Sequence, residues 1–140
     1  MSAYGVETVS VDGRSTAMGS AGPFTLVSID RPRVAAEGWD STGAQLLNLA
    51  VAACISNDLF REAARSGIVL RRVRVTASSD YEGDPAVSTP IEYQVEVDGD
   101  ASEEALSDLV KRVDEIAEIP NSIRQGTEVR LSSVRLGGAT

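Results

Sequence analysis

A long apolar segment with one cysteine near its middle constrains this chain most. Between Leu46 and Ala64 almost every third or fourth residue is Leu, Val, Ala, Ile or Phe, and Cys54 is the chain's only cysteine. A helix that is apolar on most of its faces belongs inside a protein or at an interface. Its C-terminal half is too polar to cross a membrane, which needs roughly 20 apolar residues in succession. The segment therefore predicts a central, buried helix that carries a thiol.

Composition narrows the chemistry that the chain can perform. Its 140 residues have a net charge of −8, which disfavours nucleic-acid binding because affinity for phosphates depends largely on basic patches. The absence of histidine excludes Ser-His-Asp and Cys-His activation and histidine-ligated metals. One cysteine excludes an internal disulfide and a cysteine-rich zinc site. We expect no metal and no cofactor, so any chemistry depends on Cys54, carboxylates, Arg, Lys or Tyr.

The first third of the chain predicts strands and a loop. Residues 4–11 alternate polar and apolar side chains and meet Asp12-Gly13, a strong hairpin signal, and a second strand covers roughly Phe24 to Ile29. A loop follows, and Ser41 or Thr42 is placed to cap the central helix. No secretory signal is recognisable at the N-terminus, so we expect a cytoplasmic protein.

Two further strands, a helix and a last strand are predicted after Gly67. Apolar residues alternate with polar ones over 72–77 and 91–97, which favours an antiparallel pair, with Arg72 and Arg74 across from Glu92 and Glu96. Residues 100–104 cap a second helix, Pro120 ends it, and a short helical turn restarts at that proline. Thr127 to Leu136 alternates as a final strand, with Val129, Leu131 and Val134 facing inward.

This order of elements predicts an α+β fold with two helices packed on a mostly antiparallel sheet. We expect one domain over residues 1–140. Residues 1–38 would supply the N-terminal strands and loop, and residues 39–136 a helix–strand–strand–helix–strand core.

One family shares these features. In the predicted central helix, Leu46-Leu47 is followed by Ala52-Ala53-Cys54. An antiparallel strand pair comes next, and a second helix then leads into Ile119-Pro120 and a closing strand. This arrangement resembles the OsmC/Ohr family of osmotically inducible and organic hydroperoxide resistance proteins. The spacing of the leucines and the cysteine within this element order carries the resemblance.

The resemblance implies an intertwined homodimer whose two central helices pack side by side. It also implies a thiol-dependent hydroperoxide reductase that acts in oxidative stress defence. In the family, a cysteine on the central helix attacks the peroxide, and a second cysteine, before a proline, resolves the resulting sulfenic acid. An arginine and a glutamate support the first thiolate.

Only the first cysteine has a clear counterpart, which is Cys54. Ile119 and Pro120 occupy the position of the Cys-Pro pair, so the resolving cysteine is absent. The family's glutamate falls at Ala44 or Gln45, neither of which is an acid. Its arginine corresponds to either Arg31 or Arg33, with Glu37 or Asp40 available to orient the guanidinium.

Two interpretations remain open. In the first, the protein is a one-cysteine peroxidase, and Cys54 reacts with organic hydroperoxide and is restored by an external thiol reductant. In the second, it is a non-catalytic dimer with a binding or structural role that kept the fold and retains Cys54 as packing. Ile119 and Ala44 favour the second interpretation, because both make the site more apolar. Cys54 and the arginines favour the first.

Overall fold

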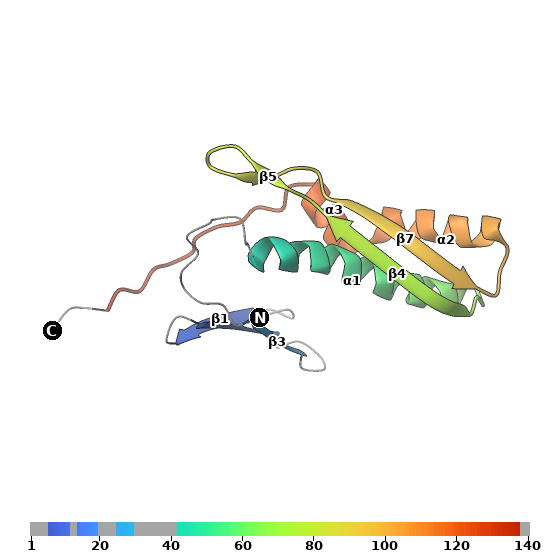
Figure 1. The fold of residues 1–140 in the computed structure, drawn as a ribbon, viewed down its shortest axis with the longest axis horizontal. Helices are drawn as coiled ribbons and strands as arrows, with labels where there is room; N and C mark the ends of the chain where they lie inside the picture. The colour runs from blue at the N-terminus through green and yellow to red at the C-terminus, as the bar shows by residue number, and fades with distance from the viewer. Residues whose placement is uncertain (1–5, 12–13, 20–24, 30–41, 138–140) are drawn as a thin grey trace. The chain divides into compact units, whose positions relative to one another are not determined.

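The computed structural model describes residues 6–11, 14–19, 25–29 and 42–137, and up to residue 42 it describes only the backbone (Figure 1). Two units, Met1–Gln45 and Leu46–Thr140, have separate sets of internal contacts. The first holds strands β1 (Val6–Val11), β2 (Arg14–Gly19) and β3 (Thr25–Ile29). They form an antiparallel sheet in the order β1-β2-β3, with Val11 opposite Arg14. These strands confirm the hairpin predicted after residues 4–11 and the strand predicted over roughly Phe24 to Ile29.

Helix α1 (Thr42–Arg65) is the predicted central helix. Its C-terminus is closed by Gly67, whose φ of 70° suits a residue without a Cβ. The Gly67 amide donates to the Ala64 carbonyl at 3.2 Å, and the Ile68 amide donates to the Ala63 carbonyl at 2.9 Å. These two bonds satisfy carbonyls that the helix leaves unpaired, and Ile68 then packs against the core.

Strands β4 (Leu70–Ser78) and β7 (Glu92–Gly99) form the predicted antiparallel pair. Val73 lies opposite Val97, and alternate side chains face the helices or the solvent, as period-two patterning requires. Arg74 is opposite Glu96 as predicted, with 3.8 Å between their charged groups. Arg72 lies opposite Asp98 and not Glu92, because the pairing of the inward-facing valines sets the register. Between β4 and β7, β5 (Tyr81–Glu82) pairs with β6 (Val87–Ser88) as a short hairpin.

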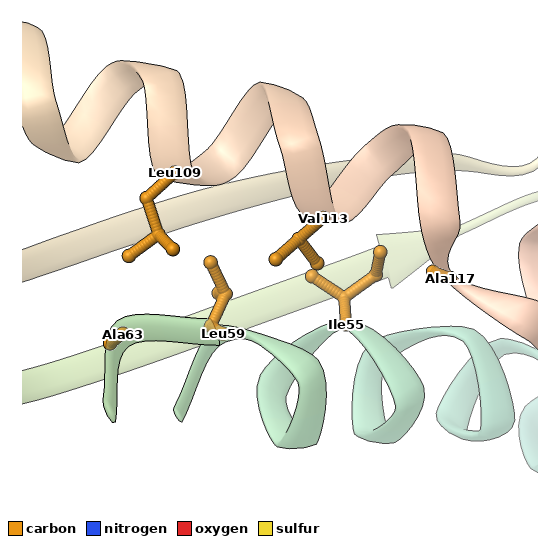
Figure 2. Close-up of a cluster of buried hydrophobic side chains, with 6 residues drawn as sticks. All are labelled: Ile55, Leu59, Ala63, Leu109, Val113 and Ala117. Atoms are coloured by element: carbon orange, nitrogen blue, oxygen red, sulfur yellow. The ribbon is translucent and has the colours of Figure 1, made fainter. Parts of the chain in front are cut away.

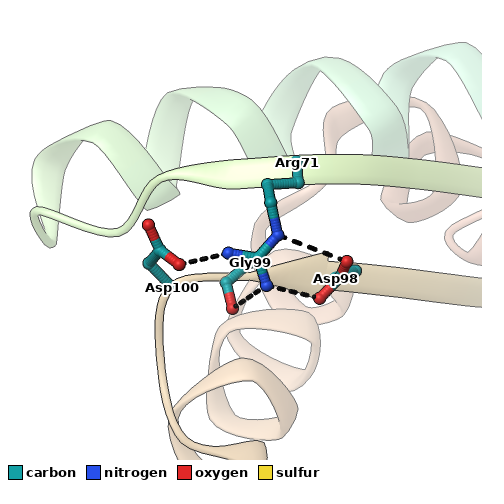
Figure 3. Close-up of polar contacts among 4 residues, drawn as sticks. All are labelled: Arg71, Asp98, Gly99 and Asp100. Carbon is teal, nitrogen blue, oxygen red and sulfur yellow. Dashed lines mark hydrogen bonds and ion pairs between the residues drawn. The ribbon is translucent and has the colours of Figure 1, made fainter.

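The β4–β7 pairing shifts register between Leu70 and Arg72, and Arg71 occupies this irregularity. Its guanidinium bonds the Asp98 carboxylate through Nη2 at 2.8 Å, the Gly99 carbonyl at 3.2 Å and the Asp100 carboxylate (Figure 3). The two carboxylates raise the pKa of Arg71, and Arg71 lowers the pKa of Asp98. Arg71 therefore joins the start of β4 to the end of β7.

Helix α2 (Glu103–Ile116) begins where the polar cap predicted. The Ser102 hydroxyl accepts a hydrogen bond from the Ala105 amide at 3.1 Å, and Glu103 and Glu104 lie in the first turn, at the positive end of the helix dipole. Helix α3 (Glu118–Arg124) follows after the extended Ala117. Pro120 is therefore the third residue of α3 and not its first.

The core of the second unit lies between α1, α2 and the β4–β7 pair. Six buried side chains form it, and Figure 2 shows those of α1 facing those of α2 and Ala117: Ile55, Leu59, Ala63, Leu109, Val113 and Ala117. Half-buried valines of both strands pack against the cluster. The α+β fold class predicted from the sequence is confirmed.

The predicted last strand is wrong. Residues 127–137 have no regular secondary structure, and Val129 and Leu136 are 94% and 88% exposed. Leu131 and Val134 are also exposed and do not face inward. Alternation gives a segment the capacity to form a strand, but a strand also needs a neighbour to bond with, and the described part of this chain does not provide one.

Candidate functional site

Cys54 lies about three turns into α1 and is half-buried. It packs against the core cluster, whose nearest member in sequence, Ile55, is almost completely buried. The thiol is thus placed at the border of the apolar core and retains some exposure. This position is too far from the helix N-terminus for the dipole to stabilise a thiolate, since that effect is confined to the first turn.

The segment at the position of a second cysteine is held firmly against α2. Ile119 is half-buried and Pro120 is buried. Arg124 donates to the Asp114 backbone carbonyl at 2.9 Å, and the side-chain amide of Asn121 donates to the Glu115 backbone carbonyl at 2.8 Å. In the sequence, this segment comes directly after Ala117. Ala117 belongs to the core cluster that Cys54 also contacts.

Of the other site residues predicted from the sequence, only Gln45 is among the described residues. It is exposed near the start of α1, and the first turn of that helix has no acidic residue. The remaining four lie outside the described residues: Arg31, Arg33, Glu37 and Asp40. The structure therefore does not test which arginine accompanies Cys54.

Sequence reasoning missed an ion pair on α1. Asp58 is only 6% exposed, and its carboxylate Oδ1 lies 2.9 Å from Arg61 Nη2. Asp58 is four residues after Cys54, which places the two side chains on one flank of the helix. The spacing from cysteine to acid to arginine was visible in the sequence, but the burial that makes the acid notable was not.

A second buried acid lies one turn farther along α1. Glu62 is 7% exposed, and its carboxylate lies 3.1 Å from Arg65 Nη1 and 3.8 Å from Arg112 Nε of α2. Arg112 also donates to the Ser66 hydroxyl at 3.0 Å. A buried carboxylate is costly unless it is paired, so both acids of α1 have the partners that physical chemistry requires.

A polar network joins β7, α2 and α3. The Tyr93 hydroxyl donates to the Asp114 carboxylate, which also accepts from Arg124 Nη2 at 2.7 Å. Burial and the adjacent carboxylate raise the pKa of Tyr93 to about 12. The hydrogen bond from Tyr93, followed by the Arg124 contact, lowers the pKa of Asp114.

A groove of about 540 Å³ lies beside this network. Its walls combine apolar side chains with one lysine and two acids, and Cys54 is not among its lining residues: Tyr93, Val95, Val110, Lys111, Asp114 and Glu115. In the described part of the chain, no three Cys, Asp or Glu residues are grouped so that they could hold a metal ion. None of the three described helices has the length and apolar content of a membrane span.

A comparison with protein families matches residues 38–132 to the family described as OsmC-like protein. The matched region contains α1 with Cys54, the β4–β7 pair, α2 and α3. A comparison with curated proteins finds no match.

Solved structures share the fold at low sequence identity. An OsmC-like protein from Mycoplasma pneumoniae is 19% identical with a TM-score of 0.66, and the match covers 89% of this chain and 88% of that one. An organic hydroperoxide resistance protein OsmC from Legionella pneumophila is 17% identical, with a TM-score of 0.58 and coverage of 86% and 88%. A hypothetical protein from Aquifex aeolicus is also 17% identical, with a TM-score of 0.66 and 91% of both chains covered.

Proposed function

Since this chain belongs to the OsmC-like protein family, we propose that it is a one-cysteine peroxidase that reduces organic hydroperoxides with Cys54 and an external thiol. One observation carries the proposal. Cys54 lies at the edge of the core with part of its surface exposed, on the central helix of a chain that the family model matches over 38–132. A similar structure from Legionella pneumophila is described as an organic hydroperoxide resistance protein.

The reaction requires one nucleophile and two external reactants. The Cys54 thiolate attacks the terminal peroxide oxygen, so that an S–O bond forms, the O–O bond breaks and the alkoxide leaves and takes a proton as the alcohol. Cys54 is then a sulfenic acid. Two equivalents of an external thiol complete the cycle: the first forms a mixed disulfide and releases water, and the second releases the Cys54 thiol and the reductant's disulfide.

The second cysteine of the family is absent, so another thiol must reduce the Cys54 sulfenic acid. Ile119 has no thiol, so the sulfenic acid has no internal partner among the residues of this chain, of which Cys54 is the only cysteine. Without added thiol, the reaction should therefore stop after about one equivalent of peroxide per chain. Oxidative stress defence is the physiological role that this chemistry favours.

We further propose that the protein is an intertwined homodimer. Leu49 and Phe60, both on α1, are 56% and 50% exposed, and four large apolar side chains of residues 129–136 are exposed as well. Exposed apolar surface of this extent is typical of an interface. A second copy would cover it with an equivalent surface.

The alternative is a non-catalytic dimer that binds a small molecule or has a structural role. Two observations favour it: the first turn of α1 has no acid, and the half-buried Ile119 replaces a thiol. In this alternative Cys54 packs against the core without reacting, as free cysteines often do.

The test is a stoichiometric oxidation. An organic hydroperoxide is added to the protein, and the sulfenic acid is trapped with a dimedone probe and located by mass spectrometry. We expect one adduct per chain at Cys54, none in Cys54→Ser, and continuous peroxide consumption only when a small thiol is present. An intact, untrapped Cys54 under excess hydroperoxide would favour the non-catalytic alternative.

A further inference from the structure

Cys54, Asp58 and Arg61 follow one another along a single flank of α1. Residues three and four apart on a helix lie one above the other, with about 5–6 Å between their Cβ atoms. Helical side chains lean toward the N-terminus. Arg61 therefore leans toward Asp58, as the 2.9 Å contact between them records. The same geometry directs the Asp58 side chain to the turn that holds Cys54.

The burial of this pair increases its electrostatic effect. The Asp58 side chain is 9% exposed, whereas Arg61 is 53% exposed and reaches the acid from the solvent side. A charge acts more strongly on its neighbours when water is excluded from between them. The Glu62–Arg65 pair repeats this contact. Its members lie about 12 Å and about 16.5 Å along the axis from Cys54, against about 6 Å and about 10.5 Å for Asp58 and Arg61. Arg112, which reaches α1 from α2, contacts Glu62 and Ser66 rather than Asp58.

We propose that the Asp58–Arg61 ion pair tunes the reactivity of Cys54, with Arg61 favouring the thiolate and Asp58 opposing it. The proposal rests on the proposed function only in taking Cys54 as the reactive thiol. Asp58 also positions Arg61, since the buried carboxylate holds the guanidinium on the flank of Cys54. Arg61 is thus a cation on the same face of α1 as the thiol, seven residues after Cys54.

The test measures alkylation of folded protein by iodoacetamide across a range of pH. In this reaction the Cys54 thiolate forms an S–C bond, iodide leaves, and the thiol proton goes to solvent. Arg61→Gln should slow the reaction at neutral pH by roughly tenfold, because it leaves the Asp58 charge uncompensated. Asp58→Asn should accelerate it by roughly threefold, because the amide oxygen still accepts from Arg61 while the opposing charge is gone.

Opposite signs separate an electrostatic role from a structural one. Both substitutions disrupt the same ion pair, so a purely structural role would shift both rates in the same direction. Arg61→Lys should restore most of the rate lost in Arg61→Gln, because it restores the charge. Arg65→Gln is the control, since it removes the nearer of two cationic partners from a buried acid that lies farther along α1 from Cys54, and its rate should match the wild-type rate.

Three patterns among the variants would overturn the proposal: equal rates for all of them, changes of the same sign in Asp58→Asn and Arg61→Gln, or an equal loss in Arg65→Gln. Urea unfolding of each variant confirms that folded protein is compared. Absence of alkylation in the folded wild-type would also overturn it. The opposite-signed pattern without any hydroperoxide reduction would support the tuning and contradict the proposed function, so the two can fail separately.

Discussion

The Tyr93 hydroxyl donates a hydrogen bond to the Asp114 carboxylate and thereby joins β7 to α2. The same carboxylate accepts from Arg124 of α3, so one acid connects three elements of the second unit. Together with the bonds from Arg124 and Asn121 to backbone carbonyls of α2, this acid holds α3, and with it Ile119, against α2.

Asp114→Asn should destabilise the protein by about 1 kcal/mol at neutral pH. Hydrogen bonds to a charged group are worth more than this, but Asp114 and Arg124 are each nearly half exposed, which reduces the contribution. The folded pKa of Asp114 is lowered, so its stabilisation is complete above the unfolded pKa of about 3.9 and is lost as pH falls through the folded pKa. Urea unfolding should therefore show a constant gap between wild type and variant down to about pH 4 and a shrinking gap below it. A gap that widened in acid would contradict the role of Asp114.

Tyr93→Phe tests the same network from the alkaline side. The pKa of Tyr93 is raised to about 12 in the folded protein, whereas an unfolded tyrosine ionises near about pH 10. The neutral hydroxyl therefore makes its full contribution to the free energy of unfolding below about pH 10, and this contribution is lost as pH rises toward about 12. The wild type should lose unfolding free energy relative to Tyr93→Phe in this window, as measured by urea unfolding at several pH values. Identical pH profiles for the two proteins would show that the hydroxyl does not make the described hydrogen bond to Asp114.

Ile119→Cys tests whether position 119 neighbours Cys54. If the family geometry holds, oxidation should form an internal disulfide, which requires a Cα separation of ~4.4–6.8 Å or a short movement to reach it. Mass spectrometry would show the loss of two hydrogens within one chain. The disulfide should also allow multiple peroxide turnovers with a dithiol reductant. Exposed Ile123→Cys on the same helix serves as the control and should remain reduced. A folded Ile119→Cys protein that forms no disulfide would show that positions 54 and 119 are not neighbours. The assignment of Ile119 to the position of the second cysteine would then be wrong.

Leu49→Glu combined with Phe60→Glu tests the homodimer. Both side chains are about half exposed on α1, so the charges should be tolerated by a monomer and repelled at an interface between two copies. Sedimentation at micromolar concentration should give about twice 14.7 kDa for the wild type and close to the single-chain mass for the variant. Val69→Glu, at another exposed apolar position outside α1, should leave the mass unchanged. A wild-type protein that is monomeric and stable when dilute would rule out the intertwined arrangement.

Gly99→Ala should destabilise the β4–β7 pair by about 1–3 kcal/mol. A Cβ at Gly99 would lie 2.7 Å from the Val69 carbonyl oxygen and 3.1 Å from Leu70 Cδ2, and the carbonyl belongs to the backbone, which cannot yield easily. Thermal unfolding measures the effect, and Gly137→Ala, with no atom within 4 Å of the added Cβ, is the control. Equal melting temperatures for the two variants would mean that the close approach at Gly99 does not exist.

The sequence predicted those elements whose ends and faces are encoded locally. Gly67 marked the end of α1, Ser102 and the acids after it marked the start of α2, and alternation around Val73 and Val95 marked the strand pair. Each of these signals acts over a few residues, so neighbouring sequence is sufficient to read it.

The features that were missed depend on packing and pairing that the neighbouring sequence does not encode. The alternation of residues 127–136 was real, but no strand adjoins them in the described part of the chain. Asp58 and Arg61 appeared as interruptions of an apolar helix, and only burial shows that the acid is enclosed and paired. Arg31 and Arg33 remain predictions, because they lie outside the described residues.

The exposed segment after α3 carries its own protection against aggregation. Its large apolar residues are never adjacent in sequence, because Arg130 separates Val129 from Leu131 and Arg135 separates Val134 from Leu136. Charged residues within an apolar, strand-prone segment act as gatekeepers that discourage stacking into cross-β assemblies. Arg130 and Arg135 therefore keep an exposed, strand-prone segment from becoming a site where copies of the protein aggregate.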